Sequence, residues 1–180
     1  ASPVLLFERG MAHFRSGDPI ASSIDFDRFN RLDPNRAPHN WQRGISLYYA
    51  MRFEEGRRQF ELHQKVNPND VENAAWHYLC AARETDTTQA RRKLMPIEGD
   101  ARIPMAQIHG LFAGKVQPEA VLEAARAGNP SPPVLRQQEF YAHLYLGLYY
   151  EADKDNKKAE FHMREAAKRA EPGNYMGDVA

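Results

Sequence analysis

A repeat period of 34 residues near the start of the sequence constrains the fold more than any other feature. Shifting the chain by this period superimposes five identical pairs, which are Arg9/Arg43, Gly10/Gly44, Phe26/Phe60, Pro34/Pro68 and Asn35/Asn69. Periods of this length are typical of arrays in which each unit is a pair of helices, and stacking of the units buries a continuous core. The sequence therefore predicts an all-α chain of stacked helix pairs.

Local signals divide the first repeat into two helices. Ser2 and Asp18 each precede a proline, and a capping residue before proline is typical of a helix N-terminus. We expect helices at about 3–15 and 19–31. The second helix ends before Pro34, because proline cannot continue a helix and restricts the residue that precedes it.

Small residues recur at matched places in both helices of the repeat. Gly10 and Gly44 lie in the first helices, and we expect each to mark a close approach of two helices. Phe26 and Phe60 then fill the space beside that contact. Glycine costs a helix about 1 kcal/mol relative to alanine, so its recurrence favours a packing role.

These features together resemble the tetratricopeptide repeat (TPR) family, whose units carry a small residue in each helix, an aromatic residue one turn after the second, and a closing proline. The resemblance implies a right-handed superhelical solenoid of about five helical hairpins, within a single domain that spans 1–180. The expected units are regular repeats at 2–35, 36–69 and about 138–172, a degenerate hairpin at 71–102 and a shortened hairpin at 103–129.

The order of these units is also similar to new-lipoprotein-I-type bacterial envelope adaptors. The segments that carry the similarity are Trp76-His77-Tyr78-Leu79 and Tyr145-Leu146-Gly147-Leu148-Tyr149-Tyr150. The resemblance implies an exported adaptor for envelope proteases and peptidoglycan hydrolases. The family's lipid-anchoring cysteine has no counterpart near Ala1. The sequence alone leaves the compartment open, and an exported, organellar or envelope location after loss of a targeting segment fits it.

Composition excludes several classes of function. Lysine plus arginine and aspartate plus glutamate each number 24, so the net charge is zero and the basic surface of a nucleic-acid-binding protein is not expected. Cys80 is the only cysteine, which excludes an internal disulfide and a multi-cysteine metal site. No apolar run approaches the roughly 20 residues that a membrane-spanning helix needs, so we predict a chain that does not span a membrane.

The sequence predicts no enzyme. None of the seven histidines forms a two-histidine helical pair typical of a metalloprotease, and no phosphate-binding loop or nucleophile elbow is present. Cys80 lies among apolar residues, which is typical of a small buried side chain rather than an activated thiol. We therefore expect no catalytic residue, no metal and no cofactor.

The first helix of each unit should form the inner wall of the solenoid. Helical spacing assigns nine residues to this wall, which are Phe7, Met11, Phe14, Trp41, Ile45, Tyr48, Tyr49, Leu79 and Arg83. Aromatic and arginine side chains dominate binding hot spots, so the sequence predicts a non-catalytic adaptor or scaffold that holds a protein or peptide there.

Two other uses of the inner wall stay open at this point. A C-terminal helix of the chain could fill it, or two copies could form a homodimer through it. The alternative function is an accessory or regulatory domain of an enzyme or enzyme complex, or a self-associating dimerisation module.

Overall fold

The computed structural model describes residues 2–180, and over this range it contains ten α-helices, one short 3-10 helix and no strand. The all-α prediction is therefore confirmed. The elements are α1 (Pro3–Arg15), α2 (Pro19–Leu32), η1 (Ala37–His39), α3 (Trp41–Tyr49), α4 (Phe53–Gln64), α5 (Val71–Glu84), α6 (Thr87–Arg92), α7 (Met105–Phe112), α8 (Pro118–Arg126), α9 (Pro132–Ala152) and α10 (Asn156–Ala167). Among these helices, none is both long and apolar enough to cross a membrane.

The helix starts predicted in the first repeat are confirmed by their caps. Ser2 Oγ accepts a hydrogen bond from the Leu5 amide at 3.3 Å, and Asp18 Oδ1 accepts one from the Ala21 amide at 2.9 Å. Each bond satisfies an amide that the first turn of a helix leaves without an intrahelical partner. Asp33, directly before Pro34, is the C-cap of α2.

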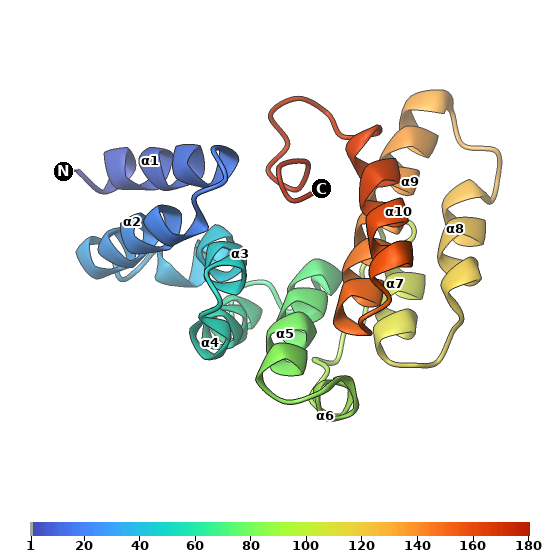
Figure 1. Cartoon of the computed structure of the whole chain (residues 1–180), viewed down its shortest axis with the longest axis horizontal. Helices are drawn as coiled ribbons and strands as arrows, with labels where there is room; N and C mark the ends of the chain where they lie inside the picture. Colours follow the sequence, from blue (N-terminus) through green and yellow to red (C-terminus); the bar gives the residue numbers. More distant parts are fainter. Residues whose placement is uncertain (1) are drawn as a thin grey trace.

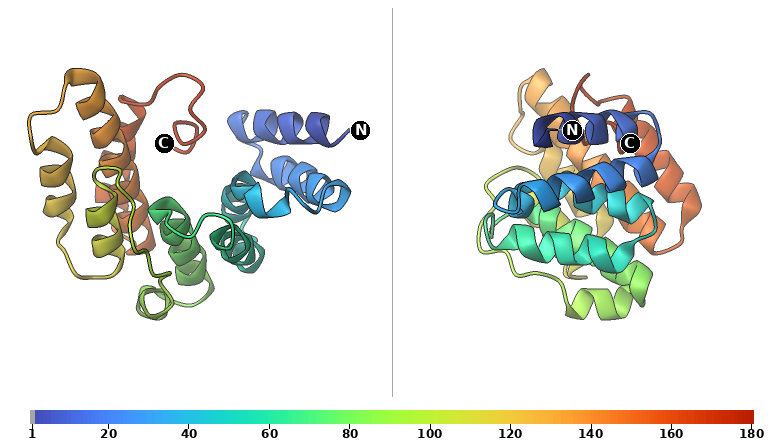
Figure 2. Two further views of the ribbon diagram at one scale, coloured as in Figure 1. Left: turned by 180° about the vertical axis from the view of Figure 1, so that it is seen from behind. Right: turned by 90° about the vertical axis from the view of Figure 1, so that its left-hand side faces the viewer.

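The helices follow one another around an arch (Figure 1). Helices α1 to α4 form one arm and α7 to α10 form the other, and Figure 2 shows the same two arms from behind. Helix α5 joins them, because it packs against α3 and α4 on one side and against α7 and α9 on the other. The last residues of the chain lie in the opening between the arms.

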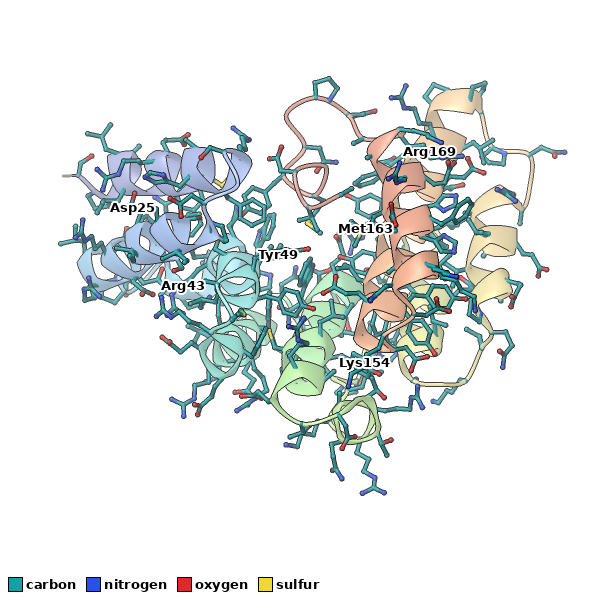
Figure 3. All side chains as sticks on the ribbon, viewed as in Figure 1. Asp25, Arg43, Tyr49, Lys154, Met163 and Arg169 are labelled. Atoms are coloured by element: carbon teal, nitrogen blue, oxygen red, sulfur yellow. The ribbon has the colours of Figure 1, made fainter. Side chains whose placement is uncertain are left out.

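The recurring glycines mark close helix contacts, as predicted. A Cβ atom added at Gly10 would lie 2.9 Å from the Phe26 ring, and one at Gly44 would lie 2.5 Å from the Phe60 ring. Gly147 of α9 has the same relation to Met163 of α10, with a distance of 3.0 Å to Met163 Cγ. Figure 3 labels Met163 on its helix. Each glycine thus admits a side chain from the next helix against its backbone.

The repeated arginines also have a structural role. Arg9 of α1 donates two hydrogen bonds to the Asp25 carboxylate, both at 2.6 Å, and Arg43 of α3 donates one to Asp27 at 2.7 Å. Figure 3 labels Asp25 and Arg43. Arg9 therefore links the two helices of the first pair, and Arg43 links the second pair to the first. The hydrogen bonds from Arg9 lower the pKa of Asp25.

The third and fourth helix pairs are less regular than the first two. Helix α6 spans only Thr87–Arg92, and an irregular segment leads from it to α7. Ala90, which aligns with the small residue Gly56 of the second repeat, is fully buried. Helix α5 is the most buried helix of these pairs, with ten of its fourteen residues buried.

Candidate functional site

The nine residues predicted for the inner wall differ in how accessible they are. Ile45 and Leu79 are fully buried, and Tyr48 is 3% exposed, so these three do not form an open binding surface. Ile45 and Tyr48 of α3 lie in the core because α4 and α5 pack against α3, and Leu79 of α5 belongs to the same core cluster. Tyr48 Oη also donates to Glu151 of α9 at 3.0 Å. Phe14 is buried as well, Arg83 is exposed, and the partly exposed wall residues are Phe7, Met11, Trp41 and Tyr49.

A polypeptide segment of the chain itself lies on the inner wall. Tyr175 of the C-terminal segment (residues 171–180) stacks on Phe14 with ring centroids 4.8 Å apart, and it meets Trp41 edge-on at 5.4 Å. Its hydroxyl lies 3.4 Å from Ser46 Oγ. Tyr175 and the adjacent Met176 are each 6% exposed. The segment is a series of turns rather than a helix, and burial raises the pKa of Tyr175.

Charged groups at the edges of the wall hold the two arms and the C-terminal segment in place. Arg15 of α1 pairs with Asp178 at 3.0 Å. Arg83 of α5 lies over the Phe53 ring, 4.8 Å from its centroid, and pairs with Glu151 of α9 at 3.4 Å. Arg83 is therefore already engaged within the chain. Figure 3 shows Tyr49 on the side of α3 that faces α9 and α10.

A cavity of about 360 Å³ lies beside the docked segment. We call it the central cavity, and it is bounded by α3, α4, α5, α9 and the C-terminal segment. Its lining residues are Trp41, Ile45, Phe60, His63, Asp70, Glu72, Asn73, Trp76, Tyr141, Gly173, Asn174, Tyr175 and Met176. Volumes of this size are within the usual range for small-ligand sites, which are mainly apolar with a few polar groups.

One side of the central cavity is acidic. Asp70 and Glu72 line it at the start of α5, and both pair with Arg102, which does not line it. Tyr145 Oη donates to Glu72 Oε2 at 2.7 Å. Burial raises the pKa of Glu72, although Arg102 and Tyr145 oppose this effect. Arg102 also pairs with Asp100 at 2.6 Å, so one guanidinium serves three carboxylates.

Two histidines meet between the last two helices, and the cysteine lies in the core. His143 of α9 and His162 of α10 face each other with their Nδ1 atoms 2.9 Å apart. Cys80 is fully buried, and burial raises the pKa of its thiol. Within residues 2–180, no group of three or more histidine, cysteine, aspartate or glutamate side chains is placed to hold a metal ion.

Sequence reasoning missed several residues of the site. Tyr175 and Met176 are the two large apolar residues of the tail, and large apolar residues in a segment without a helix pattern are a signal for docking. The pairing of His143 with His162 follows from the register that brings Gly147 to Met163. Asp70 was recognisable as a helix cap but not as part of a cavity, because the cavity depends on α9 and on the C-terminal segment.

No protein-family model matches the chain. The similarity to TPR units therefore depends on residues within this sequence, chiefly the glycines and the large side chains that pack on them. Those contacts pair α1 with α2, α3 with α4 and α9 with α10.

Proposed function

We propose that this chain is a TPR-like, right-handed superhelical solenoid that acts as a non-catalytic adaptor or scaffold. It binds a protein or peptide through the concave inner wall. The contacts of Gly10 with Phe26, Gly44 with Phe60 and Gly147 with Met163 support the TPR-like arrangement.

The docked C-terminal segment is the observation that carries this proposal. It enters the wall as an irregular polypeptide with Tyr175 and Met176 as anchors, and Phe14 and Trp41 receive the tyrosine ring. Burying each anchor contributes about 2 kcal/mol, and each aromatic pair adds about 1 kcal/mol. A wall that accepts a segment of its own chain has the shape and chemistry to accept one from a partner.

A partner segment that reaches the same contacts has to replace residues 171–180 or bind beside them. An aromatic residue followed by a flexible apolar one is the pattern that the docked segment presents. We expect a partner segment of similar chemistry to compete with it. The partner then binds with a lower apparent affinity, because displacing the C-terminal segment costs the free energy that holds this segment on the wall.

The first test uses the full chain and a labelled peptide with the sequence of residues 171–180. The variant Tyr175→Ser/Met176→Ser should release the docked segment and bind this peptide in an anisotropy titration. The unmodified chain should bind it at least about tenfold more weakly, because its own segment occupies the wall. Adding Trp41→Ala to the released variant should weaken peptide binding, because it removes the edge contact with Tyr175.

The matched control adds Leu5→Ala instead of Trp41→Ala. Leu5 is 65% exposed on α1 and takes no part in the wall. Equal peptide affinity for the unmodified chain and for both triple variants would contradict the proposal. Capture from a lysate of the source organism, with the same variants, then identifies a partner that is enriched by release of the segment and lost with Trp41→Ala.

A further inference from the structure

We propose that the central cavity binds an alkylammonium group, meaning a cationic amine on an apolar stem, through its aromatic walls and the carboxylates of Asp70 and Glu72. Binding of a free amine there does not depend on the adaptor function. The cavity is present while residues 171–180 are docked on the inner wall, and Gly173 to Met176 form part of its lining.

Aromatic rings surround the central cavity from several parts of the fold. Trp41 comes from α3, Trp76 from α5, Tyr141 from α9 and Tyr175 from the C-terminal segment. The face of an aromatic ring attracts a cation, and it also packs against a hydrocarbon stem. Rings from four elements therefore favour a ligand with both properties.

The charge of the lining selects for a cation. Asp70 and Glu72 contribute carboxylates, and no lysine or arginine is among the lining residues. Arg102 offsets only part of this charge, since it is shared with Asp100, whose side chain is 5% exposed. An anionic ligand would be repelled at this end, whereas an ammonium group gains two acceptors.

His63 also lines the acidic side of the central cavity. Its Nδ1 donates to the Pro38 carbonyl oxygen at 2.8 Å, which fixes the orientation of the ring. Its Nε2 lies 4.0 Å from Asp70 Oδ2.

Two buried polar atoms on lining residues have no hydrogen-bond partner. They are Asn73 Oδ1 and Trp76 Nε1, on side chains that are 3% and 2% exposed. Both atoms are themselves enclosed by protein, so the amine proposal rests on the aromatic rings and on the two carboxylates that line the cavity.

The chain provides a specific probe of this cavity. It has two tryptophans, Trp41 and Trp76, and both line the cavity. Their two indole N–H signals in a ¹H–¹⁵N spectrum of the full chain therefore report ligand entry, and Trp41→Phe assigns them. We expect n-butylammonium chloride to shift both signals with a dissociation constant of about 1 mM or lower.

Charge selectivity is tested with uncharged and anionic probes of the same length. At equal ionic strength, n-butanol should bind at least about tenfold more weakly, and sodium butyrate should produce no saturable shift. Binding of n-butanol as tight as that of the amine would overturn the proposal, as would the absence of any shift up to about 50 mM amine.

A pair of matched substitutions tests the role of the carboxylate. Asp70→Asn removes a charge but keeps a good N-cap for α5, so the fold should persist, and amine affinity should fall about fivefold or more. Asp86→Asn makes the same change at the N-cap of α6, outside the cavity, and should leave amine affinity unchanged. Equal affinities for both variants would refute a role for Asp70.

The amine could come from a lysine side chain of a bound polypeptide or from a free small molecule. A blocked tripeptide with a central lysine distinguishes the two sources. Tighter binding of the tripeptide than of n-butylamine assigns the cavity to a lysine side chain, and tighter binding of the free amine assigns it to a small molecule. Either result supports the amine site and leaves the adaptor proposal to its own peptide test.

Discussion

Alanine substitution of the recurring glycines tests the packing that defines the fold. Carbon atoms in contact are normally about 3.5–4.0 Å apart. A Cβ atom at Gly44 would lie 2.5 Å from Phe60 Cζ, at Gly10 2.9 Å from Phe26 Cε1, and at Gly147 3.0 Å from Met163 Cγ. The overlap therefore decreases in the order Gly44, Gly10, Gly147.

The freedom of the opposing side chain decides how much each overlap costs. Phe60 is 1% exposed and its ring stacks beside the Trp76 ring, with centroids 6.4 Å apart, so Trp76 limits its movement on that side. Met163 is only partly buried and has a flexible thioether chain that can adjust. Overpacking costs about 1–3 kcal/mol, whereas replacing glycine by alanine in a helix stabilises it by about 1 kcal/mol.

The net changes follow from these two opposing terms. We expect Gly44→Ala to lower the free energy of unfolding by about 1–2 kcal/mol and Gly10→Ala to lower it by less than about 1 kcal/mol. Gly147→Ala should leave it unchanged or raise it by up to about 1 kcal/mol. Urea unfolding followed by far-UV circular dichroism measures all three, and the midpoint for Gly44→Ala should fall by about 0.5–1 M.

A double-mutant cycle separates the ring contact from other effects of the substitution. Phe60→Leu removes the ring atoms nearest to the new Cβ, so Gly44→Ala should cost less in the Phe60→Leu background, with a coupling of about 1 kcal/mol. The reasoning fails if Gly44→Ala is as stable as the unmodified chain, or if Gly147→Ala is the most destabilised of the three.

Three further predictions concern ionisable groups. Burial lowers the pKa of His143 from the usual 6.5 to about 4, so between these pH values the unfolded chain binds more protons than the folded one. The free energy of unfolding, measured with urea, should therefore fall by about 2 kcal/mol from pH 7 to pH 5. The decrease should be smaller in His143→Phe. Arg102→Met leaves three carboxylates without their shared partner, and it should lower the unfolding free energy at neutral pH by about 2 kcal/mol. The loss should become smaller as the pH falls, because burial raises the pKa of Glu72 and a protonated Glu72 no longer needs the arginine. Cys80 should resist iodoacetamide in the native chain and react in urea, as mass spectrometry would show, because its thiol is fully buried.

The unit boundaries near the start of the chain were predictable because their signals are local. A capping residue before proline specifies a helix start through bonds within one turn, and α1 and α2 begin where Ser2 and Asp18 place them. The 34-residue period also predicted which side chain lies against each glycine, since Gly10 and Gly44 have equivalent partners. Such contacts are repeated, so one unit predicts the next.

The inner wall was only partly predictable. Helical spacing identified the face of α3 that carries Ile45 and Tyr48, but spacing cannot tell whether that face meets solvent or another helix. The structure packs α4 and α5 against α3, and Tyr48 reaches Glu151 of α9, so these side chains belong to the core. The same distant contacts bring α9 and the C-terminal segment to the central cavity.

The sequence by itself determined the all-α class, the first helix boundaries and the glycine contacts, because each depends on residues within one repeat period. Only the tertiary structure decided which wall residues stay accessible, where Tyr175 docks and how Asp70 and Glu72 come to line one cavity with aromatic rings from several elements. Those features join residues that lie far apart in the sequence, such as Phe14 and Tyr175. Their positions depend on how every helix pair turns relative to the one before it, which no local pattern specifies.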